Sequence, residues 1–271
     1  MKENFVRHEA RITYYTSPLL DRHGIKHMFT TRRGGVSAGV FESLNFAVGA
    51  GDIRDSKENV IKNHALAAEV FGLTENDICR SYQNHSTNVE VVGNEHKSTG
   101  IYKDPFPYGV DGLVTKEKNL ILSIRTADCV PVLLFDYQNR VCAAVHSGWR
   151  GTLGRIAANA VEKMCSLGAD QNRIVAAIGP CIGACCYEVG RELWEAFAQA
   201  DKGFAACFTE KDGKVFFDLT MANEMILEKS GVKAENISSA RLCTCCDKEN
   251  FFSHRRDGAN RGTMSALIMI Q

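Results

Sequence analysis

Three apolar, β-branched segments lie close together in the middle of the chain and constrain its fold more than any other feature. They read LILSI, VPVLLF and VCAAV, at residues 120–124, 130–135 and 141–145. A short gap at residues 136–140 separates the second from the third, which predicts a β-hairpin. Hairpins belong to mixed or antiparallel sheets, so the pattern favours an α+β fold over a doubly wound α/β fold.

Helical and extended patterns alternate around these strands. A helix over residues 55–72 is predicted to begin with a capping box of Asp55 and Glu58 and to end at Gly72. We expect further helices at 152–167, 191–200 and 220–230, and strands at 27–31, 78–82, 89–92, 174–178, 215–217, 237–239 and 265–270. Because no repeat, low-complexity segment or linker interrupts the 271 residues, we expect residues 1–271 to form a single domain.

The charge balance excludes several classes of partner. The chain carries 32 Lys+Arg against 32 Asp+Glu, and 45% of its residues are hydrophobic. This composition is typical of a folded protein and shows no basic excess for nucleic-acid binding. No apolar run approaches the roughly 18 residues of a membrane span, and the N-terminus lacks the apolar core of a signal peptide. We therefore expect a cytoplasmic protein that binds neither nucleic acid nor membrane.

Eleven cysteines are the unusual part of the composition. Without an export signal, we expect most of them to be reduced thiols. They are concentrated at residues 181–186 (CIGACC) and 243–246 (CTCC). Together these two runs could form a second, thiolate-only metal site. Adjacent cysteines rarely ligate one zinc ion together, however, so the sequence favours thiols that line a loop.

Three residues with metal-ligand chemistry lie at the ends of the predicted strands. His85 follows the strand at 78–82, Cys129 lies between two apolar strands, and His146 ends the next one. If these strands are neighbours, the side chains converge at one end of the sheet. Two imidazoles and a thiolate fill three positions of a tetrahedral zinc site and leave one open, as in catalytic centres. The alternative is hydrogen-bonded histidines and a buried thiol.

Several arginines lie in glycine-containing loops. Arg32 precedes Gly34 and Gly35, Arg150 belongs to GWRG, and FFSHRRDG contributes Arg255 and Arg256, with Arg261 close behind. Guanidinium groups bind phosphate through two parallel hydrogen bonds, and a helix N-terminus after GWRG would add backbone donors. Each arginine alone is as well explained as a solvated surface residue. As a group, they indicate an oxyanion or phosphate site.

Long motifs identify a resemblance that covers nearly the whole chain. FTTRRGGVS, SLNFAVG, DGLVT, TADCVPVLLFD, AAVHSGWRGT, IGPCIGACCYEVG and FFSHRRDG occur in this order between Phe29 and Gly258. The chain thereby resembles the YfiH/YlmD family, once described as polyphenol oxidase or laccase-domain proteins and now as purine nucleoside phosphorylases. The resemblance implies an α+β fold in four layers, α/β/β/α, with a mixed β-sandwich core flanked by helices.

The resemblance also implies a site and an activity. It implies that His85, Cys129 and His146 are catalytic residues that bind zinc. The reactions it implies are phosphorolysis of adenosine, inosine and S-methyl-5′-thioadenosine, with adenosine deamination as a side activity. We therefore expect purine nucleosides and phosphate as binding partners. We expect the protein to be a monomer or a homodimer. Arg32 and Asn45 match the TR-x-GG and SLN motifs and become candidate substrate contacts, and Arg150 and Arg256 are further candidates for substrate or phosphate.

Three other functions need different residues. A copper-dependent polyphenol oxidase needs many imidazoles, commonly in His-x-His pairs, but the eight histidines form no such pair. A metal-free hydrolase could use Cys129 as nucleophile and His146 as base to cleave an amide in peptidoglycan-precursor editing. No sequence feature favours the third, a non-enzymatic binding protein.

Overall fold

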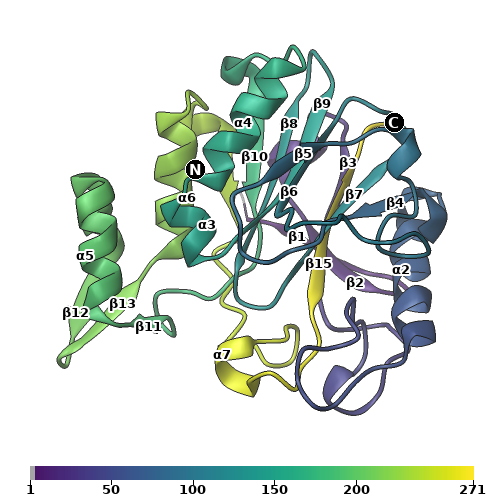
Figure 1. Cartoon of the computed structure of the whole chain (residues 1–271), viewed down its shortest axis with the longest axis horizontal. Coiled ribbons are helices and arrows are strands. Elements are labelled where there is room, and N and C mark those ends of the chain that lie inside the picture. The colour runs from purple at the N-terminus through teal and green to yellow at the C-terminus, as the bar shows by residue number, and fades with distance from the viewer. Residues whose placement is uncertain (1–3) are drawn as a thin grey trace.

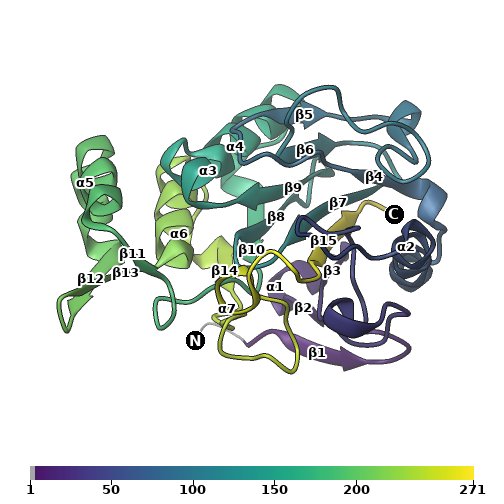
Figure 2. The ribbon, with the colours of Figure 1, turned by 60° about the horizontal axis from the view of Figure 1, so that its bottom comes forward.

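The computed structural model describes residues 4–271 and has four layers (Figures 1 and 2). Two six-stranded β-sheets pack face to face, and helices cover their outer faces. A three-stranded sheet lies beside this sandwich. The mixed α+β fold with a helix-flanked sandwich, expected from the sequence, is confirmed.

The first sheet combines both ends of the chain. Its order is β1-β2-β3-β15-β7-β4, and only the pairing of β4 with β7 is parallel among its described strands. The C-terminal strand is therefore central. The strands are β1 (Val6–Glu9), β2 (Thr13–Thr16), β3 (Lys26–Thr30), β15 (Met264–Met269), β7 (Ile121–Thr126) and β4 (Ile78–Arg80).

The second sheet has the order β14-β10-β8-β9-β6-β5. Its strands are β14 (Ile237–Ser239), β10 (Ile174–Ile178), β8 (Val130–Asp136), β9 (Val141–Ser147), β6 (Gly112–Thr115) and β5 (Val89–Val91). β8 and β9 form the predicted antiparallel hairpin, in which Val130 pairs with Ser147 and Asp136 with Val141.

Alternating side chains along the hairpin build two separate parts of the core. In β8, Leu133 and Phe135 point between the two sheets, while Val132 and Leu134 point toward the helices outside. Successive side chains of a strand point to opposite faces, so a strand covered on both sides must be apolar throughout. This explains why the central strands read as continuous apolar runs rather than as alternating ones.

Helices cover both outer faces of the sandwich. α2 packs on the first sheet, whereas α4 and α6 pack on the second. The α-helices are α1 (Pro18–Asp21), α2 (Lys57–Phe71), α3 (Trp149–Leu153), α4 (Ile156–Ser166), α5 (Arg191–Ala200), α6 (Leu219–Lys229) and α7 (His254–Asp257). Short 3-10 helices are η1 (Gly39–Phe41), η2 (Glu75–Asp77), η3 (Asn94–His96), η4 (Gln171–Arg173), η5 (Lys202–Cys207) and η6 (Ala234–Asn236).

α5 and the small sheet of β11 (Glu188–Val189), β13 (Lys214–Phe217) and β12 (Phe208–Lys211) project from one side of the sandwich (Figure 1). Aromatic rings hold this projection together. The ring centroids of Phe208 and Phe217 lie 4.3 Å apart, and those of Phe197 and Phe217 lie 4.7 Å apart. Aromatic pairs at such distances add to the stabilisation from burial.

Two local predictions were wrong. The helix expected over 152–167 is split in two, because Arg155 adopts a left-handed conformation with φ of 57° between α3 and α4. The N-cap of α2 is Ser56, whose hydroxyl accepts the backbone N–H of Asn59, and not Asp55. Gly72 ends α2 with φ of 76°, as predicted.

Candidate metal centre and active-site cavity

His85, Cys129 and His146 converge, but from both sheets. His85 follows β4 of the first sheet, Cys129 lies in the turn that connects the two sheets, and His146 belongs to β9 of the second. Their ligand atoms all lie within 4.8 Å of one another, and Cys129 Sγ is 3.8 Å from His85 Nε2. The sequence predicted convergence of neighbouring strands in one sheet. The three residues instead meet where the two sheets come together, and they form a group that could hold a metal ion.

The turn that carries Cys129 is fixed by its neighbour, Asp128. Asp128 has a left-handed backbone with φ of 87°, which is uncommon for a residue with a side chain. Its carboxylate accepts hydrogen bonds from Thr244 Oγ1 at 2.6 Å, Ser253 Oγ at 3.0 Å and the Arg255 backbone N–H at 2.7 Å. These contacts offset the conformational cost and hold the Cys129 thiol toward the histidines.

Asp111 orients both histidines and was not recognised as a site residue from the sequence. Its buried carboxylate lies 2.8 Å from Nδ1 of His146 and accepts the backbone N–H groups of Asn84, His85 and Ser86. Metal-binding histidines usually donate their second ring nitrogen in this way. The available signal was the DGLVT motif, in which Asp111 directly precedes β6.

The charges of the group favour a thiolate. Burial by itself would raise the pKa of Cys129, but the neighbouring His146 and His85 lower it to about 6. Burial would lower the pKa of His146, but the Cys129 thiolate and Asp111 raise it to about 9. Without a metal, both shifts favour a thiolate beside an imidazolium. Metal binding needs the thiolate and displaces the imidazolium proton.

The group lines a cavity of about 570 Å³, a size typical of small-molecule sites. Apolar and aromatic side chains make up part of its wall, and cationic side chains surround the rest. The lining residues are Ala47, Gly49, Ala50, Gln83, His85, Arg125, Thr126, Ala127, Asp128, Cys129, His146, Trp149, Arg150, Ile182, Tyr187, Leu219, His254, Arg255, Arg261 and Thr263.

Two arginines of this wall are half-buried and incompletely paired. The Nε atoms of Arg125 and Arg261 have no hydrogen-bond partner among residues 4–271. Burial lowers the pKa of both guanidinium groups, and the charge of Arg261 lowers the pKa of Arg125 further. Buried charges without partners are costly, and arginine is suited to bidentate binding of phosphate. This part of the wall is thus suited to an anion.

Arg32 and Arg256 do not reach the cavity. Arg32 donates from Nε to the carbonyl of Glu42 at 2.8 Å, and its guanidinium stacks 4.3 Å from the ring centre of Phe252. Arg256 donates to the carbonyls of Thr244 and Phe251, at 3.0 and 2.8 Å. Both guanidinium groups therefore hold loops together in this structure.

Asn45 lies behind the cavity wall and Arg150 lies on it. The amide of Asn45 donates to Ala47 O and Asp55 Oδ2 and accepts the Thr263 N–H. Asn45 is fully buried, so it shapes the wall through Ala47 and Thr263, which line the cavity. Arg150 lines the cavity directly, with its guanidinium 4.3 Å from the ring centre of Trp149.

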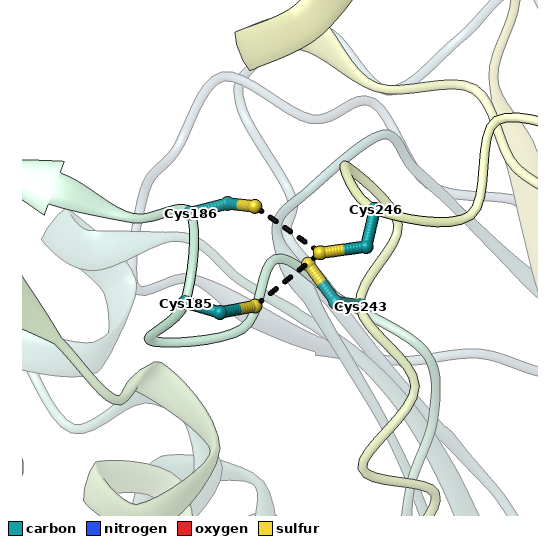
Figure 3. A group of neighbouring side chains, drawn as sticks. All are labelled: Cys185, Cys186, Cys243 and Cys246. Atoms are coloured by element: carbon teal, nitrogen blue, oxygen red, sulfur yellow. Dashed lines mark hydrogen bonds between the residues drawn. The ribbon is translucent and has the colours of Figure 1, made fainter.

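A second group of metal-ligand atoms lies outside the cavity. Cys185, Cys186, Cys243 and Cys246 have sulfur atoms within 4.8 Å of one another (Figure 3). These residues, from here on the four-cysteine cluster, were expected to be loop-lining thiols without a common site.

No helix of the described part of the chain is long and apolar enough to cross a membrane.

Comparisons with known proteins place the chain in a family. A purine nucleoside phosphorylase of Bacteroides thetaiotaomicron is 35% identical over 97% of both chains. A protein named adenosine deaminase RL5, from an unknown prokaryote, is 37% identical over 86% of this chain and 90% of its own. The crystal structure of YfiH from Bacillus licheniformis superposes with a TM-score of 0.87 and 31% identity, covering 97% of this chain and 98% of that one. The sequence model of the family described as multi-copper polyphenol oxidoreductase laccase matches residues 26–271, and the chain therefore belongs to this family, which includes the YfiH and YlmD proteins.

Proposed function

We propose that the protein is a zinc-dependent purine nucleoside phosphorylase that acts on adenosine, inosine and S-methyl-5′-thioadenosine. One observation carries the proposal: a candidate metal group and two incompletely paired arginines face the same cavity. The names of the relatives point to the same substrate class. We further propose that residues 1–271 act as one domain, in a cytoplasmic monomer or homodimer.

The donor set suits zinc. Two imidazole nitrogens and one thiolate, His85, His146 and Cys129, leave an open position toward the cavity, as in catalytic zinc sites. A bound zinc ion supplies a Lewis acid beside the substrate. Blue-copper sites share the two-histidine, one-cysteine set but add a distant axial ligand, usually methionine. No methionine is among the described residues that line this cavity.

The remaining wall supplies the rest of the reaction. In phosphorolysis, a phosphate oxygen bonds to C1′ of the ribose, and the bond from C1′ to the purine breaks with its electron pair moving to the base. Arg125 and Arg261 hold the phosphate and neutralise its charge in the buried site. Trp149 and Tyr187 offer aromatic surface for a purine ring. Adenosine deamination, the activity in the name of one relative, is proposed as a side activity in the same cavity.

Product analysis with and without phosphate tests the proposal. Purified protein with its metal content measured is incubated with inosine, adenosine or S-methyl-5′-thioadenosine, and the bases and sugar phosphates are separated by chromatography. We expect hypoxanthine and ribose 1-phosphate from inosine only when phosphate is present. Hypoxanthine release that is independent of phosphate would contradict the phosphorylase assignment. Turnover that persists after complete zinc removal would contradict the role of the metal.

A second candidate follows from the low pKa of Cys129 beside His146. A thiolate next to an imidazolium is the arrangement of a cysteine hydrolase, which would cleave an amide such as that of a peptidoglycan precursor. The two functions differ in their need for His85. A His85→Ala variant loses zinc-dependent phosphorolysis, whereas a Cys129–His146 dyad would still hydrolyse its substrate in metal-free protein.

A further inference from the structure

The four-cysteine cluster brings together two loops that are far apart in the sequence. Cys185 and Cys186 lie between β10 and β11, whereas Cys243 and Cys246 follow β14. Figure 3 shows the side chains of each pair pointing toward the other pair. Cys246 Sγ lies 3.5 Å from Cys185 Sγ and 3.3 Å from Cys186 Sγ.

Backbone hydrogen bonds hold the two loops in register. The N–H of Cys181 donates to the carbonyl of Leu242 at 3.2 Å, and the N–H of Thr244 donates to the carbonyl of Cys181 at 3.0 Å. The contact forms an isolated parallel bridge between Cys181 and Cys243. Because the backbone fixes the distance between the loops, the sulfur atoms approach one another without a covalent bond.

Each loop presents its two sulfurs from a tight turn. The N–H of Cys186 donates to the carbonyl of Gly183 at 3.0 Å, and the N–H of Asp247 donates to the carbonyl of Cys243 at 3.1 Å. Cys243 and Cys246 are separated by two residues, which is the C-x-x-C spacing of zinc sites. The prediction of loop-lining thiols missed this spacing. In the turn that begins at Gly183, the adjacent Cys185 and Cys186 both point toward Cys243 and Cys246.

The spacing of the sulfurs suits one metal ion. Zinc–sulfur bonds of about 2.3 Å in a tetrahedron place the sulfurs about 3.8 Å apart. Here the sulfurs lie within 4.8 Å of one another, and two of the distances are 3.3 and 3.5 Å. The Gly183 N–H also donates to Cys243 Sγ at 3.2 Å, a contact that stabilises a thiolate.

We propose that the four-cysteine cluster is a second metal site, which binds one zinc ion through four thiolates. Four protein ligands close the coordination sphere, so this zinc is structural rather than catalytic. Both loops contact Asp128: the Ile182 N–H donates to its carbonyl at 2.9 Å, and Thr244 Oγ1 donates to its carboxylate at 2.6 Å. The ion thereby fixes the turn that presents Cys129 to the cavity.

Metal analysis of matched cysteine variants tests this site. The full chain is purified without oxygen and with reductant, loaded with zinc, desalted and analysed by mass spectrometry for metals. We expect Cys185→Ser and Cys246→Ser to lose about one zinc ion per chain relative to the unmodified protein. Cys245→Ser lies in the same loop but outside the cluster, and it should keep the full amount. His85→Ala should keep the cluster zinc, which separates this site from the cavity.

Cobalt supplies a readout that does not depend on the folding of variants. Co²⁺ bound to the unmodified protein by four thiolates gives intense tetrahedral ligand-field bands and a sulfur-to-metal charge-transfer band, which His85→Ala should retain. Full zinc content in Cys246→Ser, or iron in place of zinc, would overturn the proposal. So would an intact mass of the anaerobically purified protein showing a disulfide between these cysteines, with no thiolate–cobalt band.

Discussion

Asp111 Oδ1 lies 2.8 Å from Nδ1 of His146, and both side chains are buried. A hydrogen bond from Nδ1 to this carboxylate leaves Nε2 of His146 as the atom available to a metal. The same carboxylate accepts the backbone N–H of His85 at 3.1 Å. One acidic residue therefore positions two of the three candidate ligands, without being a ligand itself.

The first prediction concerns Asp111→Asn. A neutral amide cannot accept all the hydrogen bonds that the carboxylate now accepts, so the orientation of His146 and of the His85 backbone should loosen. Zinc affinity at the cavity should fall by about 10- to 100-fold, the usual effect of removing a residue that orients a ligand. Competition with a chromophoric chelator measures the affinity, in the Cys246→Ser background so that the four-cysteine cluster does not contribute.

Asp136→Asn is the matched control for this experiment. Asp136 is also a buried carboxylate that accepts backbone N–H groups, but it lies at the opposite end of the β8–β9 hairpin from Cys129. Its replacement should lower the free energy of unfolding and leave zinc affinity unchanged. Equal losses of zinc affinity in both variants would show that Asp111 acts only through overall stability.

A second prediction uses the close approach of Gly148 to two of the candidate ligands. A Cβ atom at Gly148 would lie 3.0 Å from Cys129 Sγ and 3.0 Å from His85 Cδ2, although the backbone φ of −76° suits alanine. Gly148→Ala should therefore weaken zinc binding about tenfold or more, while the free energy of unfolding stays the same or rises by about 0.4–1 kcal/mol. Zinc titration and urea unfolding of the same sample measure the two effects.

Gly203→Ala provides the comparison for Gly148→Ala. Its Cβ would meet the side chains of Asp201 and Met225 at similar distances, 3.1 and 3.2 Å, far from the cavity residues in the sequence. Zinc affinity should be unaffected by this change. If Gly148→Ala also leaves zinc affinity unchanged, then Cys129 and His85 are not held in the geometry described.

The order of the main elements could be predicted from the sequence because burial makes it visible. The hairpin of β8 and β9 is apolar on both faces, and α2 ends at Gly72, whose left-handed backbone favours glycine. β1 and β11 were missed because their residues are mostly exposed and carry no apolar pattern. β6 was missed because its four residues, GLVT, are too short to show a period.

The candidate site was only partly predictable for a different physical reason. His85, Cys129 and His146 carry chemistry that stands out in a sequence. The contributions of Arg125 and Arg261 depend on burial and on missing partners, which only the packed structure reveals. Arg32 and Arg256 have the same residue type, but carbonyl groups of neighbouring loops occupy their donors. Residue type alone cannot separate these two situations.

A third prediction follows from the pKa of Cys129, which His146 and His85 lower to about 6 against the effect of burial. The thiolate is the reactive form, so it is present above about pH 6 and lost as the pH falls below that value. In metal-free protein, alkylation of Cys129 by iodoacetamide should rise to half its maximal rate near pH 6. Peptide mass spectrometry after short pulses of reagent measures the rate at each cysteine.

Cys142 and a histidine variant are the references for alkylation. Burial raises the pKa of Cys142, so this thiol should not react in the folded protein over the same pH range. His146→Ala removes the main charge that stabilises the thiolate, and the midpoint for Cys129 should move upward toward the ordinary value. A midpoint that stays near pH 6 in His146→Ala would contradict the proposed ion pair.

The last prediction separates phosphate binding from stability at Arg125 and Arg261. Arg125→Met and Arg261→Met each remove a guanidinium whose Nε has no partner, while they keep most of the side-chain volume. Loss of a charged hydrogen bond worth about 1.5–3 kcal/mol should raise the KM for phosphate about 10- to 100-fold. Because a buried Nε without a hydrogen-bond partner is destabilising, the free energy of unfolding should stay the same or increase. Arg33→Ala, which breaks only the exposed pair with Glu249, should change neither quantity. Phosphate-dependent initial rates and urea unfolding distinguish the outcomes, and a variant that unfolds more easily with an unchanged KM would show that these arginines serve the fold instead of the phosphate.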